Sequence, residues 1–246
     1  MVFATGVAAG SVGVAEAVGA GASAEGTRVR VWDLPTRVFH WSLAALVVAS
    51  IMTAKVGGNA MEWHFRSGYA ILALLLFRLV WGIVGGRWSR FVHFVYAPAA
   101  SLRYLRGQSR PDEHHDVGHS PLGALSVFAL LAVLVAQVAT GLVADDEIAS
   151  AGPLVRFVSG ATSAWSTGWH KNAGQWTVVG LVALHVVAIV AYALRRRNLV
   201  GPMLVGDKLL GADVPPSVDT AGSRLVALAI AAVCAAVAVG IASLRV

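Results

Sequence analysis

Two histidines lie fifteen residues apart in one apolar segment, and their spacing indicates a particular chemistry. His170 begins the segment 170–194, and His185 lies within it. At about 100° and 1.5 Å per residue, an α-helix turns His185 only about 60° from His170 and places it about 22 Å further along. Because a bilayer core is about 30 Å thick, one helix face would carry two imidazoles at opposite depths of a membrane. This geometry suits two haem groups stacked across a bilayer, each with one axial ligand from this helix.

Two further histidines lie at matching depths on other apolar segments. His64 begins its segment on the outer side, as His170 does, while His40 lies toward the cytoplasm, as His185 does. When both axial positions of haem b are histidine, the iron transfers electrons and has no vacant position for O₂. We therefore expect two haem b groups per chain, one held by the outer pair and one by the inner pair. The alternative is that all four are packing or interfacial histidines, but ionisable residues inside membrane spans are usually functional.

The composition predicts a membrane protein. Of the 246 residues, 57% are hydrophobic and only 13% are charged, which is unlike a soluble domain. Five apolar runs are long enough to cross a bilayer: 38–54, 62–84, 121–143, 170–194 and 225–244. We expect an all-α membrane protein: a four-helix transmembrane di-haem bundle at 30–208, then a linker and one additional transmembrane helix at 209–246. Residues 1–29 have low complexity and are expected to form a disordered cytoplasmic tail.

The connections between these spans have their own character. The cytoplasmic loop 87–120 contains one expected surface helix, from Pro98 to Arg106. The outer loop ending at Gly168 carries several apolar residues, and we expect it to lie on the membrane surface over the outer histidines. The fifth span has no histidine and no charged residue, so we expect an anchor or a helix that contacts a partner.

The positive charge orients the chain and does not indicate a nucleic-acid partner. The net charge is +6, but the basic residues lie mostly on one side of the expected membrane. Thirteen of the 19 are on that side: Arg28, Arg30, Arg37, Arg87, Arg90, Arg103, Arg106, Arg110, Arg195, Arg196, Arg197, Lys208 and Arg224. Because basic residues favour the cytoplasmic side, we expect a multi-pass membrane protein with its N-terminus in the cytoplasm and its C-terminus on the outer side.

Three more residues could contact a cofactor. Arg78 is the one basic residue deep inside a span, where it could pair with a haem propionate or extend to the cytoplasmic headgroups. Arg66, close to His64, has the same two interpretations on the outer side. His119 could replace His40 as the inner ligand, hydrogen-bond to a propionate or a quinone, or be a simple loop histidine. Cys234 is the only cysteine, so a CxxCH motif for covalent haem attachment is excluded.

Several short motifs together resemble the bacterial cytochrome b561 family, which is related to the cytochrome b subunits of nickel-iron hydrogenases. The resemblance covers residues 30–208. It rests on Leu34-Pro35-Thr36-Arg37-Val38-Phe39-His40-Trp41, Trp63-His64 with Gly68-Tyr69, Phe77-Arg78-Leu79-Val80-Trp81-Gly82, Gly118-His119-Ser120-Pro121, and Trp169-His170 with His185. Family members are four-helix, di-haem b proteins that exchange electrons with quinone, and some oxidise superoxide at the outer face. The resemblance implies haem ligation by His40, His64, His170 and His185.

The sequence therefore predicts a cytochrome b that transfers electrons across the inner membrane. We expect exchange between the quinone pool and a periplasmic redox partner, such as a c-type cytochrome or a dehydrogenase subunit. The alternatives within this class are a superoxide:quinone oxidoreductase and a hydrogenase-type cytochrome b subunit. Alternatives of another class are a histidine-lined transporter and a structural anchor. All 13 acidic residues lie in the tail, the loops or the span edges, whereas a proton or cation path through a membrane usually places carboxylates inside.

Overall fold

Five helices of the described chain are long and apolar enough to cross a membrane. The computed structural model describes residues 26–109, 115, 117–211 and 214–245. Within these ranges the candidate spans are Leu34–Val56, Gly58–Val84, Pro121–Leu142, Gly160–Leu194 and Ala221–Ala242. Each overlaps one of the five apolar runs in the sequence. The protein is thus mostly helical and has the five membrane-length helices that the sequence predicts.

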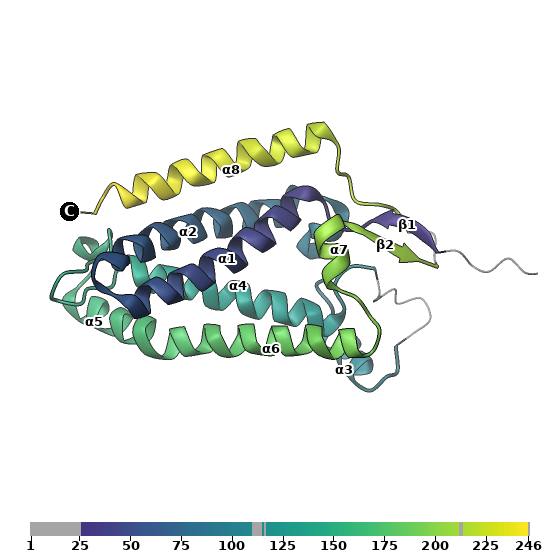
Figure 1. The fold of residues 1–246 in the computed structure, drawn as a ribbon, viewed down its shortest axis with the longest axis horizontal. Helices are drawn as coiled ribbons and strands as arrows, with labels where there is room; N and C mark the ends of the chain where they lie inside the picture. The colour runs from purple at the N-terminus through teal and green to yellow at the C-terminus, as the bar shows by residue number, and fades with distance from the viewer. Residues whose placement is uncertain (1–25, 110–114, 116, 212–213, 246) are drawn as a thin grey trace, which may run out of the picture.

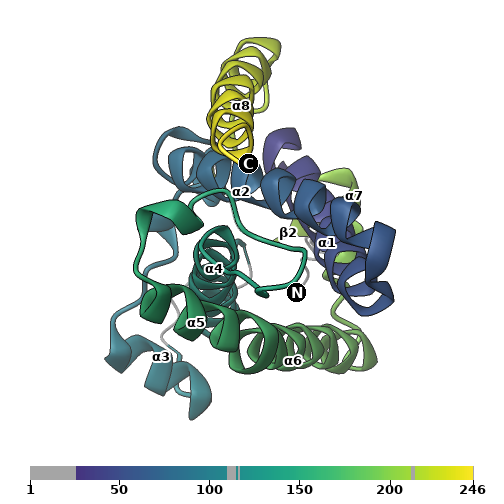
Figure 2. The same cartoon turned by 90° about the vertical axis from the view of Figure 1, so that its left-hand side faces the viewer.

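Four of the long helices form a bundle of two layers (Figures 1 and 2). Helices α1 (Leu34–Val56) and α2 (Met61–Val84) form one layer, and α4 (Pro121–Leu142) and α6 (Gln175–Leu194) form the other. Apolar side chains from all four helices make the core between the layers, among them Phe39, Ile71, Leu75, Leu134 and Val178. Helix α8 (Ala221–Ala242) lies outside this bundle, along α2.

The two ends of the bundle carry different connections (Figure 1). The end that holds the α1–α2 turn and α5 (Gly160–Gly168) is called the His64 end. The opposite end, with β1 (Thr27–Arg30) and β2 (Asp207–Leu210), is called the His40 end. Shorter helices complete the connections: η1 (Gly58–Ala60), η2 (Arg87–Ser89), η3 (Phe91–His93), α3 (Pro98–Leu105), η4 (Val155–Phe157) and α7 (Val200–Val205). Helix α3 is the surface helix that the sequence predicts.

Asp33 anchors the start of α1 to the end of α2. Its side chain is fully buried and caps α1 by accepting a hydrogen bond from the backbone nitrogen of Thr36 at 2.8 Å. It also accepts from Ser89 Oγ at 2.7 Å and from Trp81 Nε1 at 3.2 Å. An N-cap that also accepts two side-chain donors fixes the angle between the helices that carry His40 and Arg78.

A small antiparallel sheet closes the His40 end. Strand β1 pairs with β2, with Thr27 opposite Leu210 and Arg30 opposite Asp207. Thr27–Val29 belong to the segment that we expected to be a disordered tail, and the structure places them in β1 because Val29 is buried in a second apolar cluster. Arg30 also forms an ion pair with Asp207 at 2.8 Å. Residues 1–25 of the expected tail lie outside the described residues.

The expected outer loop is helical over its last part. Helix α5 continues through the π-helical segment η5 (Trp169–Gly174) into α6, which gives one helix from Gly160 to Leu194. The prediction of a surface loop up to Gly168 is therefore wrong for this stretch. Two glycines and several hydroxyl residues make its helix propensity low, but Ser159 caps it by accepting from the backbone nitrogen of Thr162 at 3.2 Å.

Candidate functional site

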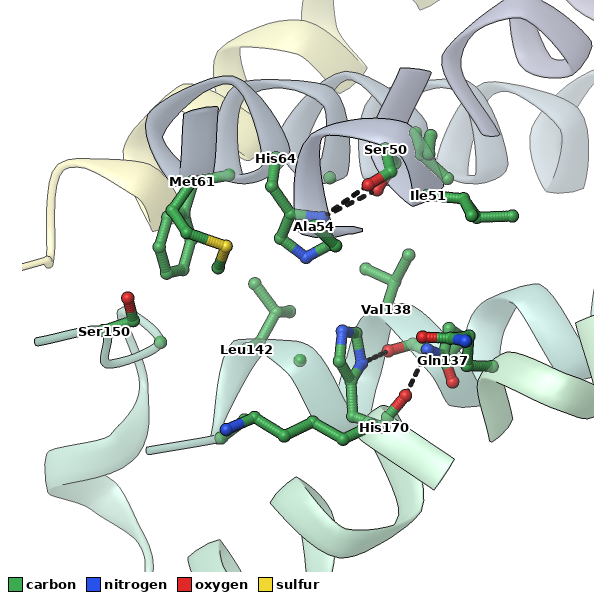
Figure 3. A pocket seen from close by; sticks show the side chains of 18 of the residues that line it. Ser50, Ile51, Ala54, Met61, His64, Gln137, Val138, Leu142, Ser150 and His170 are labelled. Atoms are coloured by element: carbon green, nitrogen blue, oxygen red, sulfur yellow. Dashed lines mark hydrogen bonds between the residues drawn. The ribbon is translucent and has the colours of Figure 1, made fainter. Parts of the chain in front are cut away.

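His64 and His170 face each other across a cavity at the His64 end (Figure 3). His64 lies in the first turn of α2 and His170 in η5, and their ring centres are 5.9 Å apart with planes at 81°. His64 Nδ1 lies 2.9 Å from the carbonyl oxygen of Ser50, and His170 Nδ1 lies 2.8 Å from that of Gln137. Because a carbonyl oxygen can only accept, both Nδ1 atoms carry the hydrogen. The Nε2 lone pair of each ring is therefore free to bind a metal.

Local backbone features make room for His170. In η5 the π-helical turn replaces the α-helical one, a change that is frequent at functional sites. Gln137 Nε2 donates to the carbonyl oxygen of His170 at 2.9 Å. At Gly141 an added Cβ would lie only 2.7 Å from Cε1 of His170. The His170 ring thus occupies space that any side chain at position 141 would take.

The cavity between these rings has a volume of about 600 Å³, which is within the range of cofactor pockets. Its wall comes from α1, η1, α2, α4, α5, η5, α6 and the loop that follows α4. Apolar side chains dominate the part within the bundle, including Val47, Ile51, Ile71, Leu134 and Val178. Lys55, Asp146 and Lys171 also line the cavity, so its wall is apolar only in part.

A second histidine pair lies at the His40 end. His40 on α1 and His185 on α6 have ring centres 6.4 Å apart, with planes at 52°. Among the described residues, Nδ1 of His40 has no hydrogen-bond partner although it is buried. His185 Nδ1 lies 3.5 Å from Ser126 Oγ, a distance at which a hydrogen bond is weak.

Both pairs have the separation that an iron between two imidazoles requires. Two metal–nitrogen bonds of about 2 Å, plus about 1 Å from each nitrogen to its ring centre, give about 6 Å between the ring centres. The observed separations are 5.9 and 6.4 Å. The spacing of each pair thus fits an iron held between its two imidazoles.

Arg78 is enclosed at the His40 end rather than extended to the surface. Its relative exposure is 3%, and its guanidinium carbon lies 4.5 Å from the ring centre of Phe91 and 6.0 Å from that of Phe39. Within the described chain, Nη1 of Arg78 has no hydrogen-bond partner. A buried cation with a free donor is the group that a carboxylate such as a haem propionate would bind.

His119 lies close to the same end, between two aromatic rings. Its ring centre is 4.7 Å from that of Trp32 and 4.4 Å from that of Phe94. Burial lowers the pKa of His119 to about 3, and the charges of Arg78 and Lys208 and then of the two nearby histidines add to this effect. The imidazole is therefore neutral at pH 7. Its Nδ1 is buried and finds no hydrogen-bond partner among the residues that the structure describes.

Arg66 is directed elsewhere. It forms an ion pair with Glu62 at 3.0 Å, and its guanidinium carbon lies 5.0 Å from the ring centre of Trp63. Its side chain is 59% exposed, and it is not one of the described residues that line the cavity. Sequence reasoning placed Arg66 near the cofactor because it follows His64 by two positions, which in a helix places it on another face.

Sequence reasoning missed Ser50 and Gln137, the residues whose carbonyl groups fix the ligand rings. A signal for one of them exists: Gln137 is the one amide side chain in a mostly apolar span. A polar side chain inside a membrane helix usually hydrogen-bonds to a neighbouring helix. No sequence signal indicates a main-chain carbonyl acceptor, because every residue carries one.

A bundle of membrane-length helices with two opposed histidine pairs defines the class of membrane cytochromes b. The comparison with known families agrees, since residues 31–206 match the family described as prokaryotic cytochrome b561. The chain belongs to this family, and it is therefore a membrane b-type cytochrome for electron transfer, a class that binds haem b. Helix α8 lies beyond the matched residues.

Curated relatives carry a more specific name. A probable Ni/Fe-hydrogenase 1 B-type cytochrome subunit of Escherichia coli (strain K12) is 27% identical over 190 residues, covering 63% of this chain and 80% of the relative. A probable Ni/Fe-hydrogenase B-type cytochrome subunit of Azotobacter vinelandii is 27% identical over 224 residues, covering 77% and 92%. One of the same name from Rhodobacter capsulatus is 24% identical over 229 residues, covering 76% and 84%.

Proposed function

We propose that this protein binds two haem b groups and transfers electrons between the two sides of the inner membrane. One haem would lie between His64 and His170, the other between His40 and His185. The observation that carries this proposal is the presence of two opposed imidazole pairs at opposite ends of one bundle, with ring centres 5.9 and 6.4 Å apart. When bound, haem with two histidine ligands supplies one-electron redox chemistry.

The residues around each pair would hold and orient the cofactor. At the His64 end, the carbonyl groups of Ser50 and Gln137 fix the two rings, and the apolar part of the cavity wall would pack against the cofactor. At the His40 end, the free Nη1 of Arg78 would bind a propionate. His119, neutral and close to Arg78, would donate or accept one further hydrogen bond to a propionate or a quinone there. Arg66 has no role in this proposal because Glu62 engages it.

Charge supports an orientation with the His40 end in the cytoplasm. The loops at that end carry most of the basic residues, so the positive-inside tendency would place the N-terminus inside and the C-terminus in the periplasm. The His64 end would then face a periplasmic redox partner, and the protein would exchange electrons with the quinone pool. The names of the relatives favour a hydrogenase-type partner subunit over a c-type cytochrome or over superoxide oxidation.

A haem count tests the proposal directly. A pyridine haemochrome assay on the purified protein should give two non-covalent haem b groups per chain. The substitution His93→Ala is a matched control, since His93 lies in η3 outside both pairs and its loss should leave the count at two. A covalently attached haem, or a count below two in the intact protein, would contradict the proposal.

A further inference from the structure

We propose that the haem site formed by His64 and His170 has a lower midpoint potential than the site formed by His40 and His185. This inference rests on the proposed function, because it needs both sites to bind haem. It follows from a difference in how the chain hydrogen-bonds the two ligand pairs.

At the His64 end, both ligand rings donate strong hydrogen bonds. His64 Nδ1 donates to the carbonyl oxygen of Ser50 at 2.9 Å, with Ser50 Oγ a further 3.1 Å contact, and His170 Nδ1 donates to Gln137 at 2.8 Å. Such bonds raise the basicity of the metal-binding nitrogen on the far side of the ring. A more basic ligand stabilises the oxidised iron more than the reduced iron, which lowers the potential of the site.

Gln137 makes the bond to His170 rigid. Its side chain donates to the carbonyl oxygen of His170 at 2.9 Å while its own carbonyl accepts from the His170 ring. Gln137 therefore holds His170 at two atoms, the ring Nδ1 and the backbone carbonyl oxygen. We assign Gln137 as a positioning residue for His170.

At the His40 end, the ligands lack comparable bonds. Nδ1 of His40 has no partner among the described residues, and the contact from His185 to Ser126 Oγ is 3.5 Å long. The imidazoles of this pair are therefore weaker electron donors, which favours the reduced iron and raises the potential.

The local charges do not reverse this order. Arg78 is buried at the His40 end, where a low dielectric makes its positive charge effective in favouring the reduced state. The buried carboxylate of Asp33 offsets part of that charge. Lys55 and Lys171 line the cavity at the His64 end, but both are exposed, so water and salt screen them. The order of potentials favours passage of one electron from the His64 end to the His40 end, with no bond made or broken.

Potentiometric titration of the purified holoprotein and two variants tests this order. Gln137→Met removes the side-chain bond that holds the His170 backbone, so the ring is held less firmly against the Gln137 carbonyl. The weaker ring bond should shift the lower-potential component upward and leave the higher one unchanged. Ser126→Asn offers an amide oxygen to His185 Nδ1, so it should shift the higher-potential component downward. Thr177→Val is a control on α6, because Thr177 is exposed and its hydroxyl, among the described residues, bonds only to the Ala173 carbonyl. Both potentials should stay unchanged.

The outcomes separate this inference from the function on which it rests. If Gln137→Met shifts the higher component, or Ser126→Asn the lower, the proposed order is overturned while the two-haem protein stands. If the intact protein shows a single component and one haem, the proposed function itself fails. The two variants act at opposite ends of the bundle, so a folding defect in one leaves the other to decide.

Discussion

Gln137 and His170 are joined by two hydrogen bonds that run in opposite directions. The His170 ring donates to the carbonyl oxygen of Gln137 at 2.8 Å, and the Gln137 side chain donates to the carbonyl oxygen of His170 at 2.9 Å. This relationship fixes α4 to the π-helical segment that carries the ligand. It also explains how His170 can have a defined orientation in a stretch of helix without regular α-helical geometry.

Gly141→Ala should disturb the His64 end alone. An added Cβ would lie 2.7 Å from Cε1 and 3.0 Å from Nδ1 of His170, so the ring must leave its observed position. We expect the haem content to fall from two groups per chain toward one. Gly180→Ala is the control, because a Cβ there meets open space in the described structure and the haem content should not change. An unchanged count in Gly141→Ala would show that His170 is not needed at its observed position.

Asp33→Ala should destabilise the bundle strongly. The substitution removes an N-cap and leaves Ser89 Oγ and Trp81 Nε1 without their buried acceptor. We expect a loss of about 3 kcal/mol in the free energy of unfolding, measured by denaturant titration in detergent. Ser159→Ala removes a solvent-exposed N-cap and should cost about 1 kcal/mol. Equal losses of unfolding free energy in the two variants would contradict the claim that Asp33 stabilises the bundle by more than its N-cap.

Acid should weaken the fold in part through His119. The pKa of His119 is lowered to about 3 by burial and by the neighbouring positive charges, whereas an unfolded histidine titrates near 6.5. As the pH falls from about 6.5 toward 3, His119 is protonated in the unfolded chain but stays neutral in the folded chain. The free energy of unfolding therefore decreases across this pH range. Between pH 7 and pH 5 the wild type should lose at most about 2 kcal/mol more than His119→Gln. Identical pH dependence in the two proteins would show that His119 titrates normally in the fold.

The proposed topology can be tested with reporter fusions. A phosphatase that is active only in the periplasm should be inactive when fused after Gln108 and active when fused after Gly152. This result follows from the concentration of basic residues in the loops at the His40 end. Activity of the Gln108 fusion would invert the orientation and place the His40 end in the periplasm.

The sequence predicts the features that depend on local composition. Five membrane-length helices follow from apolar length alone, and the His170–His185 separation follows from the rise of a helix. Together with the depths of His64 and His40, these properties predict His64 near His170 and His40 near His185, with His119 as the alternative to His40. The structure brings both pairs together. Arg78 was recognisable as a site candidate because a cation inside a span needs a partner.

The sequence could not predict features that depend on contacts between distant segments. The acceptor of the His170 ring is the backbone of Gln137, 33 positions away, and the donors to Asp33 include Ser89 on another element. Pairing of β1 with β2 joins the segments that directly precede and follow the residues 31–206 matched to the family. Regular α-helical geometry predicts an angle of about 60° between His170 and His185. The π-helical turn changes this angle, and no sequence pattern in Trp169–Gly174 predicts that turn.

The pairing of the four histidines is the central claim, and potentiometric titration of four alanine variants tests it most directly. His64→Ala and His170→Ala should each remove or alter the same haem component, while His40→Ala and His185→Ala should each affect the other one. The reason is that ring centres lie 5.9 Å apart within one pair and 6.4 Å within the other, whereas about 22 Å of helix separates the two ligands on α6 and η5. Depletion of one component by both His64→Ala and His185→Ala would contradict the pairing. The pairing would also be contradicted if the His40→Ala protein kept both haem components while the His119→Ala protein lost one.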